Sequence, residues 1–439
     1  MTATHQSTDF RVTHLDNGMR VLTSARPGDT VCAMLFVTAG SRYESRDNSG
    51  VAHMLEHLFF SGTALRPSLR AVASEIDSWG CRFNALTDHE YTAYYVHGAA
   101  EYAEPALELI GDLIQNAVLP PEDIERERKV VLAELRSRQD NQRQACRQLA
   151  NLALYGDTPM GWDTVGFPDV LRRLDRGELM TFRQAIYQPA RMIVSVAGPV
   201  SHDEIVSVVA RTLGTMAKSA DPVVRPKPAA YQPPVNLAEI RDSRLAHLCL
   251  AGPGPAYDQP EHEMMAARLM NSIFGKSMSS RLFTAIREDQ GLCYVIRSTM
   301  DPGSDVGAFL TATSVGPDNA TRLVESVSAE MVRFADDGPT PAEMAKAKAI
   351  VKGTSALDRE DATALARLSA FELMHRGFVR SRAERDALAD LVSESDVVAA
   401  ARRYLDPANL RCALVGPASA IDQLSGSKCL PSDTWRVGG

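Results

Sequence analysis

One short segment occurs twice in the chain, and this repeat limits what the chain can fold into. Pro189 and Pro407 are 218 residues apart, and so are Gly198 and Gly416. Each copy reads as the end of a helix, a proline that stops it, and a buried strand that ends at Gly-Pro. The chain is therefore predicted to consist of two halves of one design.

Each half mixes strands with helices. Thr30–Val37 and Glu90–Val96 are predicted strands, because both are apolar and rich in β-branched or aromatic residues. The predicted helices are Arg66–Trp79, Tyr102–Gln115 and Gln142–Leu154. Runs of helix separate strands that can pair antiparallel, which is a pattern of the α+β class. We expect a mainly antiparallel sheet with flanking helices in each half.

A proline-rich stretch lies between the two halves. Residues 221–228 and 232–234 together contain five prolines, so this stretch is predicted to be stiff and extended. The predicted organisation is an N-terminal metal-binding domain over residues 1–215, a linker over 216–235 and a homologous C-terminal domain over 236–439.

Three polar side chains interrupt an apolar stretch between Val51 and Leu58, in the order His53-x-x-Glu56-His57. On a helix the two histidines are one turn apart on the same face, so both imidazoles can bind one metal ion. Glu56 lies beside them, close enough to hold a metal-bound water. The order is the reverse of H-E-x-x-H and is the inverzincin signature. Two other interpretations stay open: an amphipathic helix with two hydrogen-bonded histidines, and a remnant of the motif in a non-catalytic relative.

A catalytic zinc ion takes three protein ligands and one water, so a third ligand must come from elsewhere in the chain. The segment that follows Pro120 and Pro121 has a helix-start signal, since prolines precede acidic residues. Glu127 and Glu134 are seven residues apart in this segment and therefore lie two turns apart on one helix face. For any single glutamate here, the alternative is a solvent-exposed position on the helix.

The segments at residues 40–44 and 50–63 resemble the zinc site of the pitrilysin and insulin-degrading-enzyme superfamily. The similarity is greatest to its short-chain branch, which includes the mitochondrial processing peptidase, and it covers nearly the whole chain. The resemblance implies that His53, His57 and Glu134 bind Zn²⁺. It also implies that Glu127 supports the site from behind the ligands. The second half has no such motif, and Asn271 stands 218 residues beyond His53, so one metal site is expected.

The same resemblance implies groups that bind the substrate. Backbone groups at Asn84 and Ala85 would pair with an extended peptide along the edge of a sheet. From the residues alone, an Asn-containing turn between two strands is the alternative. Arg287 would bind a substrate carbonyl, and the hydroxyl of Tyr294 would donate to the oxyanion. Without the resemblance, Arg287 would be a charge on a surface helix and Tyr294 a strand residue at the edge of the core.

The predicted function is a zinc endopeptidase that cleaves short or unfolded peptides inside a chamber. Glu56 would take a proton from the attacking water and pass it to the leaving amine. The strongest alternative is a non-catalytic scaffold or partner subunit of a processing complex, and a hydrolase of non-peptide substrates is a more remote one. A His/His/Glu set can also bind manganese or cobalt. Single-chain relatives hold four such domains, so a chain with two is expected to dimerise with itself or with a related subunit.

Composition excludes several other classes of partner. The net charge is −8 and no basic cluster stands out, so nucleic acid is not an expected partner. No run of eighteen apolar residues occurs, and no membrane span is expected. The first residues lack the features of a signal peptide or presequence, which predicts a cytoplasmic protein. The seven cysteines form no C-x-x-C pair, which indicates reduced thiols and argues against a sulfur metal site.

Overall fold

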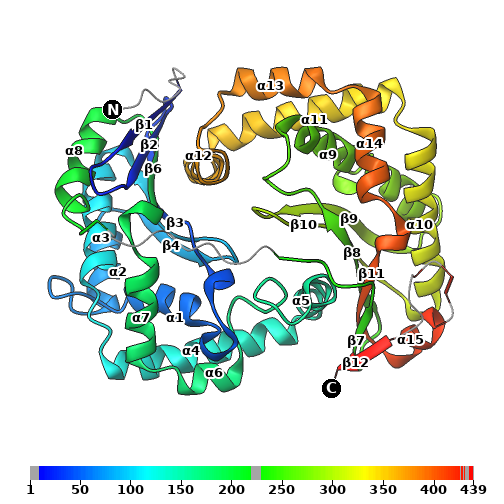
Figure 1. Ribbon diagram of the computed structural model, residues 1–439, viewed down its shortest axis with the longest axis horizontal. Helices are drawn as coiled ribbons and strands as arrows, with labels where there is room; N and C mark the ends of the chain where they lie inside the picture. Colours follow the sequence, from blue (N-terminus) through cyan, green and yellow to red (C-terminus); the bar gives the residue numbers. More distant parts are fainter. Residues whose placement is uncertain (1–8, 219–228, 426, 429, 431–434, 439) are drawn as a thin grey trace. The chain divides into compact units, whose positions relative to one another are not determined.

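The computed structural model describes residues 9–218, 229–425, 427–428, 430 and 435–438 (Figure 1). The chain forms two compact units, each assembled from three segments. The first unit contains Met1–Leu135, Asp163–Lys227 and Ala356–Ser381, and the second contains Arg136–Trp162, Pro228–Ser355 and Arg382–Gly439.

The first unit contains a six-stranded sheet in the order β1-β2-β6-β3-β5-β4. Only β2 and β6 pair in parallel, and the other neighbouring strands are antiparallel. The strand β4 lies at one end of this order and pairs with β5 alone among the described residues. The strands are β1 Phe10–His14, β2 Arg20–Ala25, β3 Thr30–Val37, β4 Arg82–Thr87, β5 Thr92–Ala99 and β6 Met192–Gly198.

The second unit repeats this design in the order β12-β7-β11-β8-β10-β9. The run β7-β11-β8-β10-β9 matches β2-β6-β3-β5-β4 in order and in strand direction. The repeated segments of the sequence are the corresponding strands β6 and β11. The predicted α+β fold with two related halves is therefore confirmed. The strands are β7 Asn236–Ile240, β8 Ala246–Gly254, β9 Cys293–Pro302, β10 Gly307–Val315, β11 Arg411–Gly416 and β12 Trp435–Gly438.

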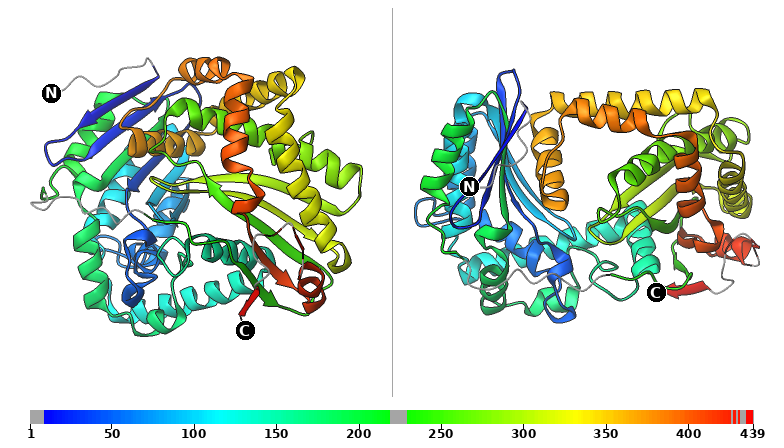
Figure 2. Two further views of the ribbon diagram at one scale, coloured as in Figure 1. Left: turned by 45° about the vertical axis from the view of Figure 1, so that its right-hand side comes forward. Right: turned by 45° about the horizontal axis from the view of Figure 1, so that its top comes forward.

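Helices cover both faces of each sheet (Figures 1 and 2). In the first unit α3 and α8 pack on one face and α12 on the other, while in the second α9, α10 and α14 lie opposite α5. The helices are α1 Val51–Phe59, α2 Leu69–Ser78, α3 Ala103–Asn116, α4 Pro121–Asp140, α5 Gln142–Tyr155, α6 Pro168–Arg173, α7 Arg176–Ile186, α8 His202–Thr212, α9 Glu261–Asn271, α10 Ala320–Asp337, α11 Pro341–Glu360, α12 Ala362–Arg376, α13 Arg382–Leu391, α14 Glu394–Tyr404 and α15 Ala418–Leu424.

The units and the halves of the sequence differ in two helices. The helix α5 comes from the first half of the sequence but covers the sheet of the second unit, and α12 does the reverse. An amphipathic pattern shows that a helix covers a core, but not which of two similar sheets it covers. The predicted domain boundaries stay a prediction. Residues 219–228 of the predicted linker lie outside the described residues, and 229–235 precede β7 without helix or strand.

Most predicted elements agree with the observed ones within a few residues. The strand predicted at Glu90–Val96 is observed as β5 at Thr92–Ala99. The helix α2 begins at Leu69 instead of Arg66, because Ser68 caps the helix by accepting from the N–H of Ala71. Among the described residues, no helix is both long and apolar enough to cross a membrane. The described cysteines are free thiols and all but Cys293 are buried, while Cys429 lies outside the described residues.

Candidate metal centre

The H-x-x-E-H motif lies on α1, and a buried carboxylate defines where that helix begins. The Glu44 side chain accepts hydrogen bonds from the N–H groups of Gly50 and Ala52, each at 2.8 Å. Burial raises the pKa of Glu44 to about 8, although these two donors act in the opposite direction. Gly50 has φ +91°, and a Cβ there would lie 2.4 Å from the Val165 carbonyl oxygen. The helix start is therefore fixed on two sides.

The opposite side of α1 is anchored in the core of the first unit. Leu55, Leu58 and Phe59 are fully buried. The ring of Phe59 packs edge-on against Tyr94 and Tyr187, with centroids 5.6 and 4.8 Å away. This packing prevents α1 from rotating, so its polar side chains keep one direction.

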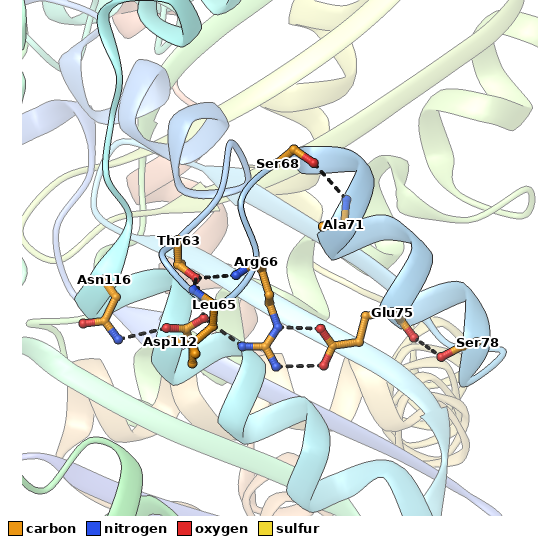
Figure 3. A network of polar contacts seen from close by, with 9 residues as sticks. All are labelled: Thr63, Leu65, Arg66, Ser68, Ala71, Glu75, Ser78, Asp112 and Asn116. Atoms are coloured by element: carbon orange, nitrogen blue, oxygen red, sulfur yellow. Dashed lines mark hydrogen bonds and ion pairs between the residues drawn. The ribbon is translucent and has the colours of Figure 1, made fainter.

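A polar network holds the chain segment that follows α1 (Figure 3). Arg66 binds Glu75 through two contacts of 2.5 and 2.7 Å and reaches Asp112 at 2.7 Å. The Thr63 hydroxyl donates to the same Asp112 oxygen at 2.7 Å. These bonds join the segment to α2 and α3, and paired groups of this kind make a rigid support for the end of α1.

The segment that carries Glu127 and Glu134 forms α4, which begins at Pro121 as the helix-start signal predicts. Ile124, Val131 and Leu135 form its buried face. Glu127 is buried beside that face, whereas the Glu134 side chain keeps 35% of its surface exposed. The seven-residue spacing thus places both carboxylates along one side of the helix.

The structure brings together the three side chains that the sequence predicts as metal ligands. One ligand atom from each of His53, His57 and Glu134 lies within 4.8 Å of the others. Nε2 of His53 and Nε2 of His57 are 3.7 and 3.5 Å from Oε2 of Glu134. Bonds of about 2.1 Å to a tetrahedral zinc ion would separate ligand atoms by about 3.4 Å. These spacings are long for direct hydrogen bonds but fit ligands around a shared cation.

Glu127 contacts the other nitrogen of His57, with Oε2 3.4 Å from Nδ1. Burial alone would lower the pKa of His57, but its contacts with Glu127 and Glu134 and the nearby charge of Glu56 raise it to about 9. The contact with His57 in turn lowers the pKa of Glu127. The surrounding carboxylates therefore favour positive charge at this place, which a bound cation would supply.

Sequence reasoning missed one contact in this site. The Thr87 hydroxyl donates to Oε2 of Glu56 at 2.5 Å, and Glu56 itself is buried. Thr87 is the last residue of β4, and strand alternation places its side chain on the same face of the sheet as Phe83 and Ala85, which pack against the core around α1. That alternation was a signal in the sequence, although it did not specify a partner.

The two residues predicted to bind a peptide backbone lie on the edge strand. Asn84 pairs with Tyr95 within the β4–β5 ladder, so the alternative of a turn at Asn84 is wrong. The N–H of Ala85 donates to the side-chain oxygen of Asn84 at 2.9 Å. That a peptide binds there stays a prediction.

Arg287 and Tyr294 belong to the second unit. Arg287 lies in the π-helical segment Phe283–Glu288, and its guanidinium is 5.5 Å from the ring centre of Tyr294. Tyr294 is at the start of β9 and is 81% exposed. The structure brings these two side chains to each other, and their predicted action on a substrate at the metal stays a prediction.

Comparison with known proteins decides which family these residues belong to. The sequence model described as Insulinase (Peptidase family M16) matches residues 20–166, and that described as Peptidase M16 inactive domain matches residues 173–351. The chain belongs to peptidase family M16. The first M16 match includes both histidines of the motif and Glu134. The second includes Asn271, whose side-chain oxygen accepts from the Ser298 hydroxyl at 2.6 Å.

M16 relatives match the chain over most of its length. A protein of Mycobacterium leprae named as an uncharacterized zinc protease is 33% identical over 369 residues, 82% of each chain. One of Bacillus subtilis with the same description is 29% identical over 345 residues, which are 78% of this chain and 83% of the relative.

Two solved structures share the M16 fold of this chain. A protease from Helicobacter pylori has a TM-score of 0.85 at 21% identity and covers 93% of this chain and 99% of its own. A Pseudomonas fluorescens structure described as a peptidase M16 inactive domain has a TM-score of 0.83 at 20% identity, with 93% and 98% covered.

Proposed function

We propose that this chain is a zinc-dependent endopeptidase that cleaves short or unfolded peptides held in extended conformation. One observation carries the proposal: two imidazoles from α1 and one carboxylate from α4 converge, with ligand atoms within 4.8 Å of one another and Oε2 of Glu134 3.7 and 3.5 Å from the two imidazoles. The presence of Glu56 next to these ligands supports a hydrolytic site over a purely structural one, because structural zinc sites need no neighbouring base. The zinc-protease names of the M16 relatives support the choice of metal.

His53, His57 and Glu134 would hold the ion. When bound, Zn²⁺ lowers the pKa of a water ligand and polarises a carbonyl group. Glu56 accepts the proton of the attacking water and delivers it to the leaving amine. Glu127 keeps the ring of His57 in place through Nδ1.

The remaining groups act on the substrate. The free edge of β4 at Asn84 and Ala85 offers backbone groups to a peptide strand, and such pairing accepts many side-chain sequences. Arg287 and Tyr294 are assigned to the negative charge that develops on the scissile carbonyl. We also propose that the chain works in the cytoplasm as a dimer, with itself or with a related subunit.

The experiment compares the parent protein with Glu56→Gln on a random peptide pool, with and without a chelator. The variant should retain about one zinc per chain yet lose cleavage by about 10²- to 10⁴-fold, because the ligands remain and the base does not. Glu122→Gln is the matched control, since Glu122 is an exposed carboxylate on α4. Cleavage by Glu56→Gln at the parent rate would refute the assignment of the base.

A non-catalytic subunit is the second candidate. The match of residues 173–351 to a model described as Peptidase M16 inactive domain supports it. Metal content separates the two candidates: a purified chain without zinc that takes up none from solution supports the scaffold.

A further inference from the structure

We propose that Thr87 is a positioning residue that holds the carboxylate of Glu56 in one orientation for proton transfer. The inference rests on the proposed peptidase function. The observation that supports it directly is the 2.5 Å hydrogen bond from the Thr87 hydroxyl to Oε2 of Glu56. A hydroxyl bound to a carboxylate makes a charge-assisted bond, which is shorter and stronger than a neutral one.

The end of β4 that carries Thr87 is itself held in place. Thr87 pairs with Thr92 of β5, and the turn between them is closed by a bond from the N–H of Asp88 to the carbonyl of Tyr91 at 2.8 Å. Two hydrogen bonds also join this turn to the 3₁₀ segment Ser41–Tyr43. The N–H of Ser41 donates to the carbonyl of Asp88 at 3.1 Å, and the N–H of Arg42 donates to the carbonyl of His89 at 2.8 Å.

The contact between this turn and the preceding segment leaves little space. A Cβ at Gly40 would lie 1.9 Å from the carbonyl oxygen of Asp88, so only glycine permits the approach. Arg42, which is buried, and Glu90, which is partly buried, form an ion pair across the same contact. The turn and the segment at residues 40–42 therefore form one rigid piece.

The same segment leads directly to the cap of α1. Glu44 follows it and bonds the N–H groups of Gly50 and Ala52. Residues 40–44 therefore contact both supports of the Thr87–Glu56 hydrogen bond: the strand end that carries Thr87 and the helix that carries Glu56. The hydroxyl and the carboxylate meet because their supports are joined, and neither can move away without breaking buried hydrogen bonds.

The chemical consequence is an unequal role for the two oxygens of Glu56. A carboxylate that rotates freely presents either oxygen to the attacking water. The hydrogen bond to Oε2 instead holds the carboxylate plane of Glu56 in one orientation. Threonine suits this task because its branched side chain has few χ1 rotamers in a strand. Since Thr87 acts through Glu56 and not on the substrate, its loss should change kcat and leave KM nearly constant.

The first test measures peptide cleavage by zinc-loaded Thr87→Val and Thr87→Ser. The valine variant keeps the shape and loses the hydroxyl, so kcat should fall about 10- to 100-fold with unchanged zinc content. The serine variant keeps the hydroxyl and should recover most of that loss. Thr299→Val is the matched control, because Thr299 is an exposed threonine of the corresponding edge strand β9. An unchanged kcat in the valine variant, or a change in KM or zinc content alone, overturns the inference.

The second test needs no activity and no metal. Urea unfolding of chelator-treated Thr87→Val, Glu56→Met and the double variant forms a double-mutant cycle. The unfolding constants should show a coupling of about tenfold or more, because one charge-assisted bond is lost once and not twice. If the parent protein cleaves no peptide, the proposed function fails and the cycle alone decides: coupling supports the role of Thr87 in fixing Glu56, and additive effects overturn it.

Discussion

Zinc affinity of this protein should depend strongly on pH, because His57 must lose a proton before it can bind the ion. The carboxylates around His57 raise its pKa to about 9 in the metal-free protein. Affinity should therefore rise about tenfold per pH unit up to pH 9 and change little above it. At pH 7, two units below this pKa, protonation of His57 should weaken zinc binding by roughly 3 kcal/mol relative to the plateau above pH 9.

Replacement of Glu127 by glutamine tests the cause of this pH dependence. The contact of Oε2 with Nδ1 of His57 is one of the contacts that stabilise the protonated ring. In Glu127→Gln the pKa of His57 should fall, and the pH at which affinity stops rising should fall with it. The affinity on the plateau should also drop about 10- to 100-fold, because the ring loses a partner that orients it.

The measurement is a zinc titration against a competing chelator between pH 6 and pH 10. Calorimetry at pH 7 in two buffers with different heats of protonation gives the number of protons released, which should be about one per zinc. The exposed substitution Glu122→Gln should reproduce the parent curve. An affinity that stays level between pH 7 and pH 9, or a break at the same pH in Glu127→Gln, would refute the reasoning.

Two further predictions concern assembly and stability. Light scattering of the zinc-loaded protein should give the mass of a dimer under conditions where peptides are cleaved, and an active monomer would contradict the proposed assembly. Arg281, together with the N–H and hydroxyl of Thr340, lowers the pKa of Glu343 to about 2 from an ordinary value of 4.5, so these contacts should stabilise the parent above pH 4.5 and lose their effect as pH falls toward 2. Arg281→Met should be less stable by about 1–2 kcal/mol at pH 7, with the difference shrinking in acid, as urea unfolding across pH 2–7 would show.

Local periodicity explains why so much of the candidate site was predictable. The one-turn spacing of His53 and His57 and the two-turn spacing of Glu127 and Glu134 follow from helix geometry alone. The repeated Gly-Pro segments likewise marked β6 and β11, which occupy the same position in their sheets. The choice of Glu134 over Glu127 as ligand came from the family resemblance, and the distances to the histidines agree with it.

Contacts that follow no helical or strand period could not be predicted in this way. The bond from Thr87 to Glu56 and the cap that Glu44 places on α1 are two such contacts. Likewise, the sequences of α5 and α12 do not predict which of the two similar sheets each helix covers. Periodicity determines which face of an element is buried, whereas packing of the whole chain determines which partner that face meets, because the partner is selected by shape and not by distance along the sequence.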